Sequence, residues 1–264
     1  MESELKLDGH KIYYRAHGDG KPVVLLHGFG ETGDVWQHQV DFLKNNFRVI
    51  VPDLPGSGRS EMTGDMSMEG LAEATRYLVE TLEPGRPVTL IGHSMGGYIT
   101  LAFVEKYARY LNGFGLFHST AYADTEEKKA TRRKGIDFVR QHGAYEFFKT
   151  SSPNLFSPLT KQQKPALVDE FVRGLHNFSP DAVVSYYESM IKRPDRTQML
   201  KTTNLPVLFV IGAHDNAIPV KDMLEQAHLP EKAYIDLLHQ SGHMGMLEEV
   251  EKSNELLKKF VSET

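Results

Sequence analysis

Ser94 has the sequence context of an enzymatic nucleophile. Gly92, Ser94 and Gly96 form a G-x-S-x-G pattern between two apolar runs, 87–91 and 98–104. The first run predicts a buried strand and the second a helix, so the pattern falls on a very tight turn. Such a turn strains the serine backbone, exposes its hydroxyl and leaves room only for glycine on either side. Ser94 is therefore a candidate for attack on a carbonyl group.

A serine hydroxyl needs a general base, and the base needs an acid that orients it. In an open parallel sheet, such groups belong on loops beyond the carboxyl ends of the strands. Asp215 lies soon after the apolar run 207–211, and His243 lies on the loop after the run 233–238. The order Ser94, Asp215, His243 is the order that accompanies a G-x-S-x-G turn. We therefore expect these three residues to form a catalytic triad.

Acyl transfer also needs two backbone N–H groups that bind the negative oxygen of the intermediate. The N–H of Met95 lies at the start of the helix after Ser94, where negative charge is favoured. The second donor should come from the stretch 27–30, His-Gly-Phe-Gly, which follows the neighbouring strand. The N–H of Phe29 is the candidate, and His27 is expected to brace this loop.

The same glycines permit an alternative interpretation. Gly28, Gly30 and Gly33 spell G-x-G-x-x-G after a strand, and Asp53 ends the next strand, as in a dinucleotide-binding fingerprint. We set the fingerprint aside because a hairpin precedes it, because residues 56–58 crowd Asp53, and because it leaves the triad candidates unexplained. No cofactor is expected.

Other ionisable residues near these loops are expected to have plainer roles. His239 reads as a structural or surface residue, and its spacing from His243 falls on a loop, so no metal site is expected. The loop after the strand 113–117 is another place for the acid, but it opens with His118. Asp124, a little further on, is held as a reserve acid.

The composition fits a globular chain and excludes several kinds of chemistry. The 264 residues are 40% hydrophobic and 25% charged, with no cysteine and a net charge of −5. Disulfides, thiolate catalysis and cysteine-ligated zinc are therefore excluded, and nothing indicates a nucleic-acid partner. The N-terminus is polar, and every apolar run is too short to cross a bilayer. We expect a cytoplasmic protein with no membrane partner, as a monomer or homodimer.

The pattern of the first 121 residues predicts a mostly parallel, twisted sheet. Alternating residues on either side of Asp8 and Gly9 indicate an antiparallel hairpin with a type I′ turn. Strands and helices then alternate, which implies right-handed crossovers and helices on both faces. The expected strands are 22–26, 47–51, 87–91 and 113–117, and the expected helices begin near 34, at 68 and near 98.

The alternation stops near residue 119 and resumes near 206. Only helical patterns occur between, at 125–141, 144–149, 161–176 and 180–192. The chain then gives strands at 206–212 and 233–238 and helices at 220–227 and 244–261. This predicts an α/β core of residues 1–121 and 200–264, with a helical cap, 122–199, inserted after the sixth strand.

The chain resembles the α/β-hydrolase superfamily over nearly its whole length. The matching motifs are 27–30, 53–60, 92–97, 212–215 and 242–243. The branch is similar to carboxylesterases, enol-lactonases, cofactor-free perhydrolases and carbon–carbon bond hydrolases, with a helical cap after the sixth strand. Haloalkane dehalogenases and epoxide hydrolases of this fold have aspartate in place of Ser94, and carbon–carbon hydrolases often have asparagine in place of His93.

The resemblance implies a serine hydrolase that cleaves a small ester or lactone. Carbon–carbon bond hydrolysis and perhydrolysis are alternatives, and a non-catalytic receptor for a small ligand on the same fold is an alternative from another class. The cap should determine the substrate. The side chains expected to line the pocket, or else to pack the cap, include Phe29, Tyr98, Tyr145, Phe148, Tyr187 and Met190.

A basic run lies at the start of the expected cap. It consists of Lys128, Lys129, Arg132, Arg133 and Lys134. We interpret it as a solvated helix face, with attraction of a carboxylate substrate as the alternative.

Overall fold

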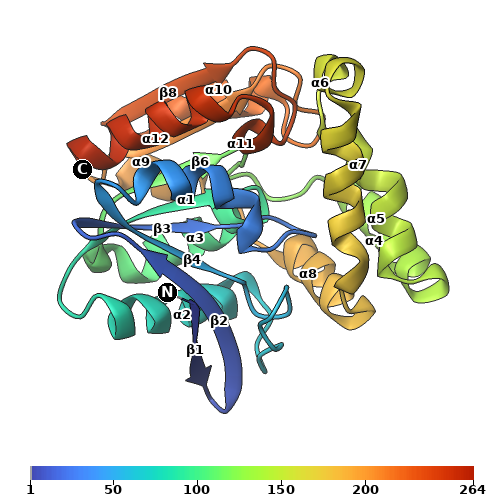
Figure 1. Ribbon diagram of the computed structural model, residues 1–264, viewed down its shortest axis with the longest axis horizontal. Coiled ribbons are helices and arrows are strands. Elements are labelled where there is room, and N and C mark those ends of the chain that lie inside the picture. Colours follow the sequence, from blue (N-terminus) through green and yellow to red (C-terminus); the bar gives the residue numbers. More distant parts are fainter. Residues whose placement is uncertain (1) are drawn as a thin grey trace.

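A computed structural model describes residues 2–264, as a sheet covered by helices on both faces with a group of cap helices at one side (Figure 1). Eight strands form the sheet in the order β1-β2-β4-β3-β5-β6-β7-β8. They are β1 (Glu2–Leu7), β2 (His10–His17), β3 (Lys21–Leu26), β4 (Phe47–Pro52), β5 (Val88–His93), β6 (Leu111–Phe117), β7 (Val207–Gly212) and β8 (Ala233–Leu238).

The direction of the strands confirms the predicted sheet. β1 and β2 form an antiparallel hairpin, β2 pairs antiparallel with β4, and all other neighbours are parallel. At the hairpin turn, Asp8 has φ 49° and Gly9 has φ 87°, the two positive values that a type I′ turn requires.

Helices and short 3-10 segments connect the strands. The α-helices of the core are α1 (Gln37–Leu43), α2 (Met68–Leu82), α3 (Met95–Tyr107), α9 (Thr197–Thr202), α10 (Val220–Ala227), α11 (Gly245–Glu248) and α12 (Val250–Glu263). The segment predicted to be a cap, called the cap below, contains α4 (Glu126–His142), α5 (Ala144–Ser151), α6 (Pro158–Gln163), α7 (Pro165–Gly174) and α8 (Pro180–Lys192). The 3-10 segments are η1 (Gly33–Trp36), η2 (Ala108–Tyr110), η3 (Ser152–Leu155) and η4 (Leu175–Asn177).

Three helical stretches differ from the sequence prediction. The expected helix 161–176 is divided into α6 and α7 because Pro165 disfavours helical geometry at Lys164, which has φ −130° and ψ 51°. The expected final helix is divided into α11 and α12 at Glu249, whose carboxylate accepts hydrogen bonds from the 240–241 loop. The short helix α9 was not expected.

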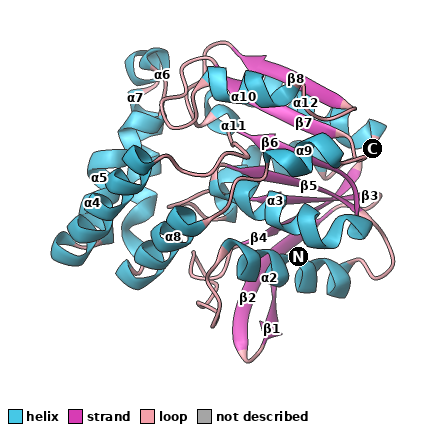
Figure 2. Cartoon of the chain, turned by 180° about the vertical axis from the view of Figure 1, so that it is seen from behind, coloured by secondary structure: helices cyan, strands magenta, loops and turns pink. Residues whose placement is uncertain are grey.

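Two hydrophobic cores lie on opposite faces of the sheet. One packs α2, α3, α9 and α10 against the sheet, and the other packs α1, α11 and α12; Figures 1 and 2 show these faces from opposite sides. β5 lies at the centre, and its Leu90 and Ile91 are fully buried in the two different cores. The turn that follows β5 is therefore anchored by a strand that is buried on both faces.

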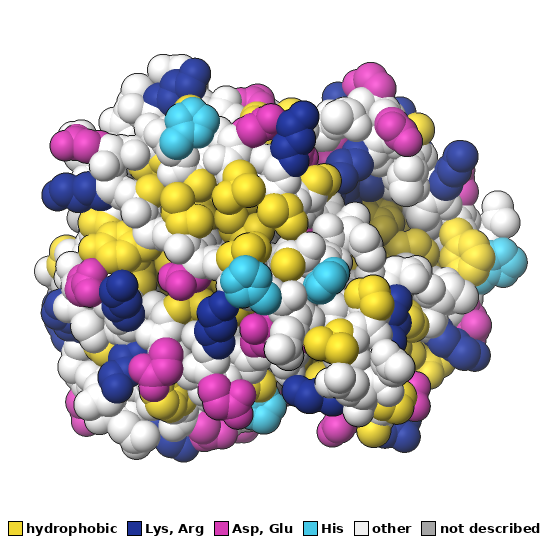
Figure 3. Space-filling model, turned by 90° about the horizontal axis from the view of Figure 1, so that it is seen from above, with side chains coloured by type: hydrophobic (Ala, Val, Ile, Leu, Met, Phe, Trp, Pro, Cys, Tyr) yellow, Lys and Arg dark blue, Asp and Glu magenta, His cyan; other side chains and the backbone are white. Residues whose placement is uncertain are grey.

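The cap helices α4–α8 stand beside the core in both ribbon views and pack around a small apolar cluster of their own (Figures 1 and 2). Strand β8 forms one edge of the sheet. Figure 3 shows apolar side chains gathered on the face seen from above, and Ile235 of β8 and Leu224 of α10 are about half exposed. Within residues 2–264, no helix combines the length and apolarity that a bilayer span needs.

Candidate active site

The chain turns sharply at Ser94, between β5 and α3. Ser94 has φ 49° and ψ −114°, a conformation that a non-glycine residue adopts only under strain. A Cβ atom at Gly92 would lie 2.1 Å from the carbonyl oxygen of Gly96, and one at Gly96 would lie 2.7 Å from that of His27. Both glycines are therefore required by the close approach of backbone. Ser94 itself is half-buried, and its hydroxyl makes no hydrogen bond to any of residues 2–264.

Asp215 and His243 are joined directly, although 28 residues separate them in sequence. The Nδ1 of His243 lies 2.8 Å from Oδ2 of Asp215, and both side chains are buried. Oδ1 of Asp215 accepts the N–H groups of Ala217 and Ile218 at 2.8 and 2.9 Å. With Oδ2 of the carboxylate facing the ring, Nδ1 carries the proton and Nε2 is left as an acceptor.

The charges of this pair stabilise one another. Burial alone would lower the pKa of His243, but the adjacent Asp215 carboxylate outweighs it and holds the pKa above its ordinary value. Burial likewise works to raise the pKa of Asp215, and the His243 ring holds it below its ordinary value. Asp215 is therefore ionised throughout the neutral range.

The pH profile of an esterase reaction should follow this shift. A general base must be neutral, so kcat/KM for an uncharged ester should fall as the pH drops through the pKa of His243. Because that pKa is raised, the midpoint should lie above about 6.5, the ordinary value of an imidazole. Initial rates from pH 5 to 9 would measure it. A midpoint below 6 would contradict the assignment of His243 as the base.

His93 brings Ser94 and His243 into the same small volume. The ring of His93, the neighbour of Ser94, lies with its centroid 4.8 Å from that of His243, and its Nε2–H donates to the carbonyl oxygen of His243 at 2.9 Å. No hydrogen bond joins the Ser94 hydroxyl to His243 within the described chain. Of the two contacts in the predicted triad, the structure thus contains the one between histidine and aspartate.

The two N–H groups predicted to bind an oxyanion have no hydrogen-bond partner in residues 2–264. Neither the N–H of Met95 nor that of Phe29 donates to any described residue. Met95 is the first residue of α3, so its N–H also lies at the positive end of a helix. The neighbouring N–H of Gly28 is occupied, because it donates to Glu31 at 2.6 Å.

A buried carboxylate–imidazole pair behind the site was missed in the sequence. Oε2 of Glu31 lies 2.9 Å from Nδ1 of His93 and also accepts the N–H of Gly28. Burial works to raise the pKa of Glu31, but His93 and the Gly28 N–H hold it below its ordinary value. Glu31 and His93 therefore connect the Phe29 loop, the Ser94 turn and the backbone of His243 in one chain of hydrogen bonds.

Two further buried residues support His243. His118 is neutral, since burial holds its pKa well below the ordinary value; its Nε2 accepts the N–H of Gly245 and its Nδ1 lies 3.6 Å from Oδ2 of Asp215. Glu248 accepts the N–H groups of Gly242 and of Ser157 in the cap, each at 2.8 Å. His118 was considered in the sequence only because it stands where an acid could have been. No sequence pattern pointed to Glu248.

The cap is attached to the site on one side. The carbonyl oxygen of Leu155 accepts the N–H of His243 at 2.6 Å, so a cap segment fixes the backbone of the histidine. On the Phe29 loop, Phe148 of α5 fills the space above Gly30, where a Cβ would lie 2.4 Å from its ring.

The predicted pocket residues separate into two groups. Phe29, Phe148 and Tyr187 come together, with ring centroids 5.4 Å apart for Phe29–Phe148 and 4.4 Å for Phe29–Tyr187. Tyr98 and Met190 are buried in the core against α3, and Tyr145 is half-buried on α5. Only the first group lies beside the Phe29 loop.

Several residues considered in the sequence lie elsewhere. His239 is exposed at the end of β8, and the buried Asp124 is paired with Arg132 and Arg193. His27 braces the Phe29 loop by accepting the N–H of Leu54 at 2.9 Å.

Asp53 serves the fold rather than a nucleotide. It is buried, and its two oxygens accept the N–H groups of Gly33 and Arg59 at 2.9 and 3.0 Å. Both oxygens are thus used inside the loop, where a dinucleotide fingerprint would need a free carboxylate for the ribose.

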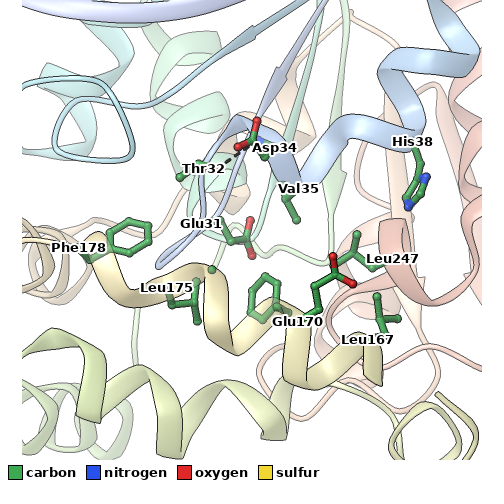
Figure 4. A pocket seen from close by; sticks show the side chains of 12 residues that line it. Glu31, Thr32, Asp34, Val35, His38, Leu167, Glu170, Leu175, Phe178 and Leu247 are labelled. Atoms are coloured by element: carbon green, nitrogen blue, oxygen red, sulfur yellow. Dashed lines mark hydrogen bonds between the residues drawn. The ribbon is translucent and has the colours of Figure 1, made fainter. Parts of the chain in front are cut away.

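A cavity of about 320 Å³ lies between the Phe29 loop and α7 (Figure 4). Its walls combine apolar side chains of α7 and η4, such as Leu167 and Leu175, with the carboxylates of Glu31 and Glu170. Ser94, Asp215 and His243 are not among the residues of its wall. Glu31, a residue of this wall, is also the partner of His93.

Comparison with known proteins agrees with this geometry. A model of the "Alpha/beta hydrolase family" matches residues 23–255. A pimeloyl-[acyl-carrier protein] methyl ester esterase of Vibrio cholerae is 26% identical, over 95% of this chain and 98% of its own. The (E)-2-((N-methylformamido)methylene)succinate hydrolase of Acinetobacter baylyi is 23% identical, over 100% and 99%. The solved structure of a thermophilic esterase from Thermogutta terrifontis has a TM-score of 0.93 and 28% identity, over 100% and 98%. The chain belongs to the alpha/beta hydrolase family.

Proposed function

We propose that this protein is a serine hydrolase that cleaves a small carboxylic ester or lactone through an acyl-enzyme. The observation that carries the proposal is the strained turn at Ser94 beside the buried Asp215–His243 pair. Relatives that are named as esterases support the choice of ester among the reactions of this family. His93, which is engaged with Glu31, stands where carbon–carbon bond hydrolases often have asparagine.

The proposed reaction has two halves. Nε2 of His243 takes the proton of the Ser94 hydroxyl as its oxygen attacks the ester carbonyl, and the N–H groups of Phe29 and Met95 bind the oxyanion. The alcohol leaves with the proton from His243. Water then attacks the acyl-enzyme with the same base and releases the acid. Asp215 fixes the proton of the ring on Nδ1 and stabilises the imidazolium in both halves.

Labelling with a fluorophosphonate tests the proposal and separates an enzyme from a non-catalytic receptor. The probe reacts with an activated serine, so it should modify Ser94 alone and abolish ester hydrolysis in the same proportion. Peptide mass analysis locates the label, and heat-denatured protein is the control for non-specific reaction. Labelling of another residue, or an unlabelled protein that hydrolyses no ester, would contradict the proposal.

A further inference from the structure

A second cavity is lined partly by the loop that follows Asp215, although Ser94, Asp215 and His243 are not in its wall either. This α4–α8 cavity, of about 780 Å³, lies between helices α4 and α8 of the cap and the loops after β6 and β7. Tyr187 in its wall stacks on Phe29, with ring centroids 4.4 Å apart. Asn216 and Ala217, also in its wall, directly follow Asp215. The cavity is therefore lined by the loop that follows Asp215, and it reaches Phe29 only through the ring of Tyr187.

One cation in this wall has no carboxylate partner. Nζ of Lys128 donates to the carbonyl oxygen of Ala217 at 3.0 Å, and no Asp or Glu of residues 2–264 lies within ion-pair distance of it. The next residue behaves differently, because Nζ of Lys129 is paired with Glu126 at 2.8 Å. Lys128 thus keeps an uncompensated charge and free N–H donors at the wall of the cavity.

A second cation in the wall is only partly compensated. Arg132 binds Asp124 through Nε at 2.6 Å, and Arg193 binds the same carboxylate through Nη1 at 2.9 Å. Two guanidinium groups on one carboxylate leave a net positive charge. Nη1 of Arg132 donates to no described residue, so it is available to a ligand. Burial raises the pKa of Tyr187 to about 12, which keeps its hydroxyl a neutral donor beside Arg132.

The wall also holds three carboxylates, those of Glu127, Asp195 and Asp222. Together with burial and Glu225, Asp222 and Asp195 raise the pKa of Tyr122, which places their charges beside that ring. Burial lowers the pKa of His243 and Asp215 raises it; the positive charge of Lys128 makes a smaller contribution, which lowers it.

We propose that the α4–α8 cavity binds a carboxylate carried by the ester substrate, with Lys128 and Arg132 as its cationic partners. The inference rests on the proposed ester hydrolysis and adds the substrate class to it. The carboxylate is a recognition group only: water is still added across the ester bond, and the carboxylate leaves unchanged on one of the two products. The two cations lie one helical turn apart on α4, so they face the same side.

Pairs of esters matched in size and differing in charge test the proposal. Mono-p-nitrophenyl glutarate is compared with p-nitrophenyl pentanoate, and 4-butyryloxybenzoate is compared with its methyl ester, so that the charge is placed on either side of the scissile bond. The measured quantity is the ratio of kcat/KM for the charged ester to that for the neutral one. The variants are Lys128→Gln and, as matched control on the same helix, Lys129→Gln.

In at least one pair, Lys128→Gln should lower this ratio about 10- to 100-fold, the range expected for loss of a charge-assisted hydrogen bond. Lys129→Gln should leave the ratio within twofold of wild type, and added salt should lower the wild-type ratio. Equal ratios in the two variants for both pairs would overturn the carboxylate site while leaving ester hydrolysis intact. If wild type hydrolyses neither member of any pair, the proposed function itself fails.

Discussion

Ser94→Ala is expected to lower kcat for a short p-nitrophenyl ester by about four to six powers of ten. Without the hydroxyl, no acyl-enzyme forms, and catalysis falls to what the oxyanion donors and binding supply on their own. The N–H groups of Phe29 and Met95 donate to no described residue and remain in place, so a small residual rate above water is also expected. Initial rates at high enzyme concentration, with tight limits on contamination by wild type, measure both.

Stability measurements distinguish this loss from unfolding. Alanine must adopt the same positive φ as Ser94, so thermal unfolding of Ser94→Ala should resemble that of wild type. Ser94→Gly should be equally inactive but more stable by about 1–3 kcal/mol, because glycine adopts this conformation without strain. An alanine variant that retained a tenth of the wild-type rate would show that Ser94 is not the nucleophile. A glycine variant that is no more stable than wild type would show that the backbone of Ser94 is not strained.

The parts of the fold and site that could be predicted are those with a local signature. The G-x-S-x-G pattern predicts the turn because its glycines allow close backbone contact, of Gly92 with Gly96 inside the turn and of Gly96 with His27 on the neighbouring strand's loop. Asp215 and His243 were found because apolar strands immediately precede their loops, and parallel strands bring such loops to one edge. The direct contact between these two residues is the part of the predicted triad that the structure contains.

The supporting contacts could not be predicted, since they depend on distances in space and have no local pattern. Glu31 meets His93 across 62 positions of sequence, and Glu248 meets Ser157 across 91. A lone glutamate in a sequence is far more often a surface residue than a buried acceptor. The break at Pro165 could have been predicted, because proline is a local signal for the end of a helix. The prediction of one continuous helix relied on the apolar periodicity around it and was wrong.

The basic run shows what helical geometry adds to composition. As a stretch of sequence it predicts a solvated face, and Arg133 and Lys134 are indeed exposed. Lys128 and Arg132, four positions apart, share the face of α4 that turns to the cavity. The four-residue spacing predicts that Lys128 and Arg132 share a face of α4. The cavity that they face depends on other segments, among them the loop after β7, and could not be predicted from this spacing.

Asp215→Asn is expected to lower kcat by about four powers of ten with little change in KM. The amide oxygen can still accept the N–H groups of Ala217 and Ile218, so the side chain should keep its orientation. Its NH₂ group then replaces Oδ2 and faces Nδ1 of His243, which must become an acceptor. The ring proton moves to Nε2, the nitrogen that should receive the proton of Ser94, so the base is blocked.

The pH profile distinguishes this mechanism from a general loss of structure. Asp215 raises the pKa of His243 against the effect of burial, so the residual activity of Asp215→Asn should have its acid limb at lower pH than wild type. Asp236→Asn, on strand β8 before the His243 loop, is the matched control and should keep the wild-type rate within about threefold. A loss of less than tenfold in Asp215→Asn would mean that another carboxylate orients the histidine. An acid limb at the same pH as in wild type would contradict the role of Asp215. Asp124, the reserve acid, is poorly suited to orient the histidine because Arg132 and Arg193 already bind it.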